Sequence, residues 1–168
     1  YRVKEFPETI KREYEEGHFI ANHTYSHKNS KLYQSKDTFL NELKSTETAI
    51  SEAIGTNYTS HLFRFPNGSK GTSYSGSKKK CIGYLKDLNY GYVDWNALNQ
   101  DSIGHYTASQ LLNNLKKSCK NKDSLVVLMH DTADVIRSYL ALQDSIRFLK
   151  DEGYTFKTFE EFVTIRDC

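Results

Sequence analysis

The sequence has no long hydrophobic run and almost no excess of charge of either sign. No stretch approaches the roughly 18–20 apolar residues that a membrane-spanning helix requires, and the opening YRVKEFPETIK lacks the apolar core of a signal peptide. Lys and Arg number 23 against 21 Asp and Glu, so the net charge of +2 lacks the basic excess typical of nucleic-acid-binding proteins. We therefore expect a soluble globular domain with no membrane span and no nucleic-acid partner.

Cysteine is scarce as well, and its distribution excludes two classes of small protein. Cys81, Cys119 and Cys168 are an odd number without metal-ligand spacing, which fits neither a zinc ribbon nor a disulfide framework. Two interpretations stay open, a bridge between Cys81 and Cys119 or three free thiols. The 168 residues suffice for one hydrophobic core, so we expect a single domain over residues 1–168.

Short β-rich runs alternate with longer helical stretches, which is typical of an α/β domain with a mainly parallel sheet. The expected strands are 19–22, 61–65, 91–97, 124–129 and 154–156. The expected helices are 5–16, 37–54, 77–88, 107–120 and 134–151. Gly17, Gly55 and Gly153 are expected as left-handed C-terminal caps. The Gly- and Ser-rich residues 67–77 predict a loop, and the absence of a strand before the first helix suggests that a first βα unit is missing.

Two histidines four residues apart, His23 and His27, immediately follow the first predicted strand. This spacing places both imidazoles on one side of a turn or helix, where their nitrogens can reach one zinc ion at about 2.0–2.1 Å. A pair at this spacing also arises by chance, so two unrelated structural histidines are the alternative.

Chemically distinctive residues gather at the C-terminal ends of four predicted strands. They are His23, then Arg64 with Pro66, then Asp94 with Trp95, then His130 with Asp131. In α/β barrels and doubly wound sheets the βα loops converge at this end to form the active site. Arg64 is suited to hold a carboxylate, and His130 is suited to acid–base chemistry. The alternative is that polar residues simply mark where buried strands leave the core.

Taken in order, HTYSH, RFPNG, VDWNALNQD and LMHD, followed by GYTFKTFEEF, resemble the motifs of the polysaccharide deacetylases of carbohydrate esterase family 4. The resemblance covers nearly the whole chain and implies a distorted (β/α) barrel. It implies metal-dependent hydrolysis of acetyl groups on a sugar polymer, usually N-acetylglucosamine units of chitin or peptidoglycan. We expect peptidoglycan first, with chitin oligomers and acetylated xylan open. The family usually acts outside the cytoplasm, here at the cell wall, and we expect a monomer.

The resemblance also implies roles for individual residues. His23 and His27 are two of three protein ligands to Zn²⁺, or to another divalent ion such as Co²⁺ or Ni²⁺. His130 is the general acid that protonates the departing amine, and Arg64 orients a catalytic carboxylate. The residues expected to face the substrate are Asn67, through its backbone N–H, Pro66, Trp95 and Leu128. For the carboxylate that tunes His130 the resemblance favours Asp101 and leaves Asp94 open.

The family's first motif, Thr-Phe-Asp-Asp, does not occur in this sequence. That motif supplies the general base and the third metal ligand, and a fragment, trimming or a disordered N-terminus explains its absence more simply than evolutionary loss. Catalytic zinc sites usually have three protein ligands, so we expect this chain to bind metal weakly and to be catalytically impaired, with an export signal or anchor upstream of Tyr1. Two other classes stay open: a glycan-binding pseudoenzyme, and an unrelated α/β domain with structural histidines.

Overall fold

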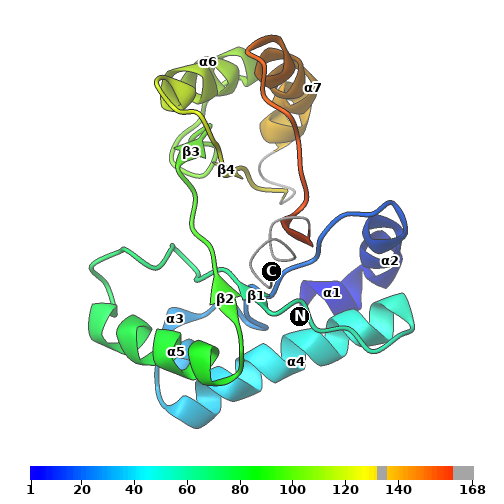
Figure 1. Cartoon of the computed structure of the whole chain (residues 1–168), viewed down its shortest axis with the longest axis vertical. Helices are drawn as coiled ribbons and strands as arrows, with labels where there is room; N and C mark the ends of the chain where they lie inside the picture. Colours follow the sequence, from blue (N-terminus) through cyan, green and yellow to red (C-terminus); the bar gives the residue numbers. More distant parts are fainter. Residues whose placement is uncertain (132–135, 161–168) are drawn as a thin grey trace. The chain divides into compact units, whose positions relative to one another are not determined.

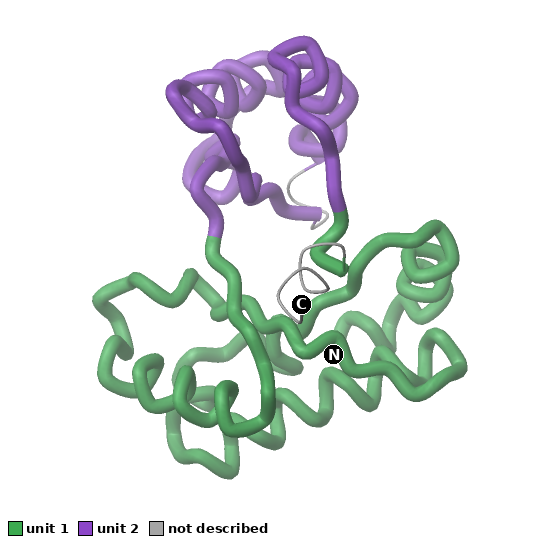
Figure 2. Tube along the Cα trace, viewed as in Figure 1, with its two compact units in different colours: residues 1–94, 158–168 green, residues 95–157 purple. Residues whose placement is uncertain are grey.

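The computed structural model describes residues 1–131 and 136–160, and the chain divides into two compact units. Unit 1 comprises Tyr1–Asp94 and Thr158–Cys168, and unit 2 comprises Trp95–Lys157, as coloured in Figure 2. Each unit has its own helices, its own pair of parallel strands and its own hydrophobic core, so each is described by itself.

Unit 1 is built of helices around one short parallel strand pair (Figure 1). Its described helices are α1 (Arg2–Glu5), α2 (Pro7–Glu15), α3 (Asn29–Leu32), α4 (Lys36–Ile54) and α5 (Ser75–Asp87). Strands β1 (Leu62–Phe63) and β2 (Gly91–Tyr92) pair in parallel, with Leu62 opposite Gly91. The buried core joins α3, α4, α5 and the strands, through Leu32, Phe39, Leu43, Phe63, Phe65, Cys81, Leu85 and Tyr90.

Helix α4 has clear start and stop signals, which explains why its prediction as 37–54 was nearly correct. Ser35 forms a capping box, since its side chain accepts the N–H of Thr38 while the Thr38 hydroxyl accepts the N–H of Ser35. Gly55 ends the helix with φ +76°, a left-handed conformation that costs glycine little. Buried residues recur at three- and four-residue spacing along α4, so one face of this helix packs in the core of unit 1.

The expected helix 5–16 is instead two helices, which corrects the prediction. Phe6 lies between α1 and α2 with ψ 56°, outside the helical region, and Pro7 is the first residue of α2. The proline ring disfavours helical geometry in the residue before it but is tolerated at the first position of a helix. Pro7 was therefore the signal for the break.

The strands are shorter than expected, and two of them are not formed as ladders. Of the expected strand 19–22, Asn22 alone pairs, in an isolated parallel bridge with Phe63. The expected strand 91–97 is divided, because its first residues form β2 in unit 1 and its last begins β3 in unit 2. A strand needs a partner backbone along its length, and each ladder here spans two residues.

Unit 2 has a second parallel strand pair, one helix that packs on this pair and a second helix that packs on the first. Strands β3 (Ala97–Leu98) and β4 (Val127–Leu128) pair directly, and helices α6 (Ala108–Cys119) and α7 (Ile136–Asp151) contact each other. Thr107 caps α6 through a capping box with Gln110. The expected start of the last helix at 134 lies outside the described residues. The inner face of α7 carries Ser138, Ala141, Ser145 and Leu149.

The expected last strand, 154–156, is not formed. Gly153 has φ +88°, and the N–H of Tyr154 bonds to the carbonyl of Leu149 in the last turn of α7. The N–H of Tyr154 is thus bonded within the helix terminus and does not pair with a neighbouring strand.

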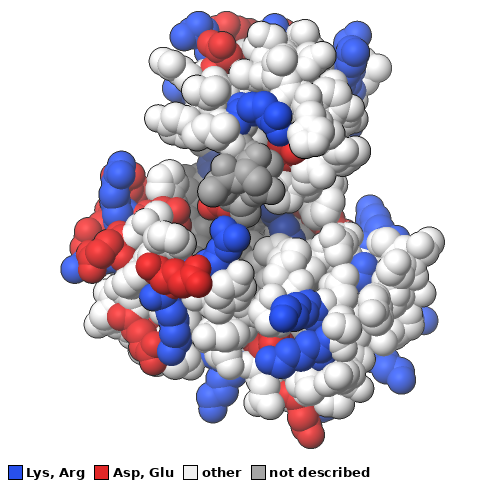
Figure 3. Space-filling model, turned by 180° about the vertical axis from the view of Figure 1, so that it is seen from behind, with Lys and Arg blue, Asp and Glu red and all other residues white. Residues whose placement is uncertain are grey.

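Of the three cysteines, Cys81 and Cys119 are free, buried thiols, and Cys168 lies outside the described residues. No described helix is long and apolar enough to cross a membrane. On the face shown in Figure 3, lysine and arginine side chains alternate with aspartate and glutamate and form no single basic surface.

Candidate active site

In unit 1, His23 and His27 lie side by side in a turn between the Asn22 bridge and α3. Their ring centroids are 4.9 Å apart at an interplanar angle of 68°, and both residues are exposed. His23 Nδ1 lies 2.7 Å from the carbonyl oxygen of Arg64. Because a carbonyl only accepts, His23 Nδ1 carries the proton and Nε2 carries the lone pair that a metal requires.

The backbone of this turn is held in an uncommon conformation. Thr24 has φ +72° and His27 has φ +55°, in the left-handed region that a β-branched residue such as Thr24 rarely adopts. The buried Asn22 side chain accepts the N–H of Thr24 at 3.1 Å, and the Thr24 hydroxyl accepts the N–H of His27 at 3.1 Å. Such strain persists only where the surroundings fix it, and it is common at functional sites.

The two imidazoles suit two positions of a zinc-type site, since neutral imidazole is a usual ligand and the Arg64 carbonyl fixes the His23 tautomer. Within residues 1–131 and 136–160, no cluster of three or more His, Cys, Asp or Glu side chains is arranged to hold a metal ion. The described residues thus offer two ligands where catalytic zinc usually has three from the protein.

Arg64 follows β1 and lies half-buried beside the loop that begins at Asn67. Burial lowers the pKa of Arg64, while the charge of Asp94 opposes that shift. Asp94 accepts the Ser69 N–H at 2.9 Å and the Ser69 hydroxyl at 2.5 Å. Asp94 therefore ties the start of the loop to the end of β2.

In unit 2, Asp101 makes the contacts to His130. One carboxylate oxygen lies 2.7 Å from His130 Nδ1, and the other accepts the backbone N–H of His130 at 2.7 Å. The Asp101 side chain is 3% exposed and that of His130 is 38% exposed. Asp101 thus holds the imidazole by Nδ1 and leaves Nε2 as the nitrogen that can exchange a proton with a substrate.

Ser138, on the inner face of α7, is the third member of this cluster. Its hydroxyl donates to Asp101 at 2.5 Å, and Asn99 supports the same group because its side chain bonds to Ser138 at 3.4 Å and to the Asp101 N–H at 3.1 Å. Burial alone would raise the pKa of Asp101, but the hydrogen bonds from Ser138 and His130 outweigh it and lower the pKa. Asp101 is therefore ionised at neutral pH.

Replacing Ser138 with alanine is expected to raise the pKa of Asp101 and to reduce stability by about 1–3 kcal/mol at neutral pH. A carboxyl group whose pKa is lowered by folding stabilises the protein above its unfolded pKa, and this contribution is lost as the pH falls through the folded pKa. The difference between the wild type and S138A should therefore shrink below about pH 4. Urea unfolding at several pH values measures it, and a difference that is constant with pH would contradict this account.

The other predicted residues lie in both units. Asn67 is exposed with φ +60° and Pro66 is buried, and both follow β1 in unit 1. Trp95 and Leu128 are partly buried in unit 2, Leu128 within β4. The structure thus brings together His23, His27 and Arg64 in unit 1, and Asp101 with His130 in unit 2.

Two residues of these sites were missed by sequence reasoning. Glu42 bonds to the histidine turn and Ser138 bonds to Asp101, and both lie on the buried faces of helices. A carboxylate within the apolar stripe of a helix was a usable signal for Glu42, since buried charges are rare unless paired. Ser138 had a weaker signal, because small hydroxyl side chains are common on such faces.

The chain is similar in sequence to known proteins of one family. A sequence model of the family described as polysaccharide deacetylase matches residues 1–93. A peptidoglycan-N-acetylglucosamine deacetylase of Bacillus cereus is 32% identical over 164 residues, which cover 95% of this chain and 56% of the relative. The chain thus spans little more than half the length of that relative.

Solved structures agree with the sequence comparison. The catalytic domain of peptidoglycan N-acetylglucosamine deacetylase from Eubacterium rectale matches at a TM-score of 0.82 and 25% identity, over 92% of this chain and 71% of that one. A carbohydrate esterase family 4 pseudoenzyme from Bacillus anthracis matches at 0.73 and 27% identity, over 95% of this chain and 51% of that one. The expected fold class, the α/β fold of the deacetylase catalytic domains, is confirmed, and the chain belongs to the polysaccharide deacetylase family.

Proposed function

We propose that the protein is a metal-dependent hydrolase that removes acetyl groups from N-acetylglucosamine residues of peptidoglycan. The observation that carries the proposal is the bond between the buried Asp101 carboxylate and His130 Nδ1, in a chain that also presents two adjacent imidazoles at His23 and His27. The substrate class is supported by the Bacillus cereus relative, which is named for activity on peptidoglycan N-acetylglucosamine.

His23, through Nε2, and His27 are the residues that would hold the metal ion, Zn²⁺ or a similar divalent ion. When bound, such an ion acts as a Lewis acid on the acetyl carbonyl and lowers the pKa of a coordinated water to about 7. The Arg64 carbonyl keeps the His23 Nε2 lone pair available by accepting the proton on Nδ1.

His130 supplies the proton that the departing amine needs. An amine leaves an amide carbon readily only when its nitrogen is protonated, and His130 Nε2 is the donor, because Nδ1 is engaged by Asp101. The Asp101 carboxylate holds the imidazole at Nδ1, and Ser138 and the His130 N–H keep that carboxylate in place. Asn67, Pro66, Trp95 and Leu128 are assigned to substrate contacts, and Arg64 to orienting a carboxylate.

We propose that residues 1–168 form one catalytic domain. A protein that acts on peptidoglycan works at the cell wall, so we propose that location, with a monomer as the working form.

Acetate release tests the proposal. Incubation of the chain with an N-acetylglucosamine oligomer and Zn²⁺ should yield slow release, because two protein ligands hold the ion less tightly than three. Chelation and His23→Ala should abolish release, whereas His18→Ala, at an exposed histidine of the same unit, should not. Release that survives chelation and His23→Ala would contradict a metal-dependent reaction.

A second candidate function is glycan binding without catalysis. It is favoured by the absence of a third His, Cys, Asp or Glu ligand near the two histidines within the described residues, and by the similarity to a family pseudoenzyme. Calorimetric titration with the same oligomer separates the two functions, because binding without acetate release would support this candidate and overturn the first.

A further inference from the structure

Glu42 lies beneath the histidine turn in unit 1, although it belongs to helix α4. Its side chain is 2% exposed, on the same helix face as Phe39, Leu43 and Ala49. Removing a carboxylate from water costs several kcal/mol unless strong partners compensate. A buried glutamate among apolar residues therefore needs partners that bond to its charged carboxylate.

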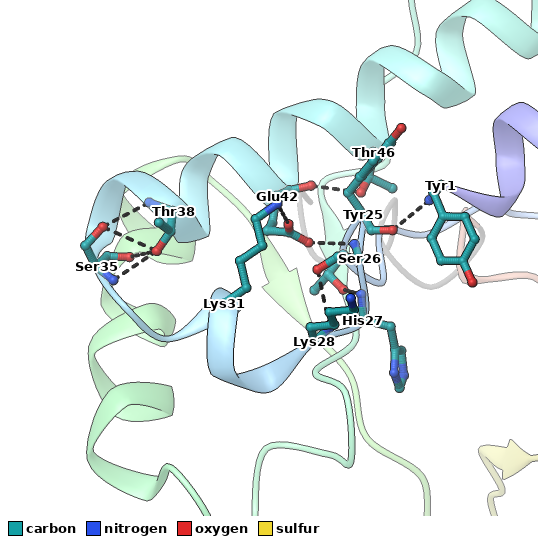
Figure 4. A network of polar contacts seen from close by, with 11 residues as sticks. Tyr1, Tyr25, Ser26, His27, Lys28, Lys31, Ser35, Thr38, Glu42 and Thr46 are labelled. Carbon is teal, nitrogen blue, oxygen red and sulfur yellow. Dashed lines mark hydrogen bonds and ion pairs between the residues drawn. The ribbon is translucent and has the colours of Figure 1, made fainter.

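Within the described residues, two groups bond to the Glu42 carboxylate, the Ser26 backbone and the Lys31 side chain (Figure 4). One carboxylate oxygen accepts the backbone N–H of Ser26 at 2.7 Å, and the other accepts the Lys31 ammonium at 2.9 Å. Ser26 directly precedes His27. The contact to Ser26 is thus a charge-assisted bond from the helix to the backbone of the turn, which is stronger than one between neutral groups.

The ionisation of Glu42 agrees with this arrangement. Burial alone would raise its pKa, but the bonds from Lys31 and Ser26 outweigh burial and lower it. The carboxylate is therefore charged at neutral pH.

The other bonds to the turn run within it or come from exposed groups, such as the Tyr1 ammonium, which donates to the Tyr25 carbonyl at 2.6 Å. The hydrogen bonds within the turn run from Thr24 to Asn22 and from His27 to Thr24, and the Ser26 hydroxyl accepts the Lys28 N–H at 3.3 Å. Within the described residues, Asn22 and Glu42 are the buried side chains outside residues 24–27 that accept N–H groups of the turn, and the bond to Glu42 is the one nearer to His27.

We propose that Glu42 is a positioning residue that holds the Ser26 backbone and thereby presents the His23 and His27 imidazoles together to a divalent metal ion. This inference rests on the metal site of the proposed function. A site whose ligands are already in place pays less conformational entropy on binding, so loss of the anchor weakens metal affinity without removing a ligand. The Lys31 contact contributes less, because that side chain is 56% exposed.

Zinc titration of the whole chain against a competing chelator tests the proposal. Glu42→Leu roughly keeps the side-chain volume but removes the carboxylate that accepts the Ser26 N–H. This substitution should weaken zinc affinity about 10-fold or more. Glu42→Gln keeps an oxygen that can accept the Ser26 N–H, so it should lose less. Lys31→Gln and Glu47→Gln, the latter on the same helix with Tyr90 as its partner, should both bind zinc as the wild type does.

Hydrogen exchange in the metal-free chain gives a second measurement. The Ser26 amide should exchange about 10-fold faster or more in Glu42→Leu, while amides of α4 outside the turn stay protected. If Glu42→Leu does not fold, Glu42→Gln still tests the proposal, since it should show smaller changes in the same direction in both measurements.

The outcomes separate this inference from the proposed function. Unchanged zinc affinity in folded Glu42→Leu or Glu42→Gln, together with a large loss in His23→Ala, would overturn the role of Glu42 and leave the metal site standing. A loss of zinc affinity in Lys31→Gln as large as that in Glu42→Leu would also overturn the role of Glu42, because the ion pair between Lys31 and Glu42 would then account for the effect. No zinc binding by the wild type would overturn both.

Discussion

Replacing His130 with alanine is expected to lower the rate of acetate release by about 10²–10⁴-fold, the usual contribution of a positioned general acid. The reason is that the amine loses its proton donor, whereas the candidate metal ligands are unchanged. Zinc affinity should therefore stay within about 2-fold of the wild type, since His130 is not among the proposed ligands. Acetate release from an N-acetylglucosamine oligomer, measured beside a zinc titration, checks both parts.

The matched control is His105→Ala, which removes an exposed imidazole from the same unit. It should retain the full rate. Asp101→Asn should also lower the rate strongly, because an amide can donate to His130 Nδ1 and favour the wrong tautomer. Equal rates for His130→Ala and His105→Ala would contradict the assignment of His130 as the acid.

Replacing Asn22 with alanine is expected to lower the free energy of unfolding by about 2–3 kcal/mol. The Asn22 side chain is almost fully buried, donates to the Leu43 carbonyl at 2.9 Å and accepts the Thr24 N–H at 3.1 Å. Its removal leaves the buried Thr24 N–H without that acceptor and opens a small cavity between the bridge to β1 and helix α4. Urea unfolding followed by circular dichroism measures the change.

Asn41→Ala is the control for this second experiment, because Asn41 is exposed on helix α4. Its effect should stay within about 0.5 kcal/mol, as for most surface substitutions. A loss of similar size in both variants would show that the Asn22 network does not support the turn.

Sequence reasoning identified the candidate site residues but not most of their partners. The order of HTYSH, RFPNG and LMHD singled out His23, Arg64 and His130, since motifs are local in the sequence. The bonds from Ser138 to Asp101 and from Ser26 to Glu42 join residues 37 and 16 positions apart, and no local pattern encodes such a distance. Of the two carboxylates considered, the structure places Asp101 on His130 and Asp94 on Ser69.

The sequence by itself determined the longer helices, because their caps and periodicity involve neighbours: the Ser35 and Thr107 capping boxes and Gly55 all act within a few residues. Even the break at Phe6 was encoded locally, by Pro7. The tertiary structure alone decided the strands, since a ladder exists only where a distant backbone lies alongside, as Phe63 does at Asn22. The tertiary structure also decided which polar side chains on buried helix faces bond to site residues, as Glu42 and Ser138 do. A buried polar group needs a hydrogen-bond partner, and the fold decides which distant residue that partner is.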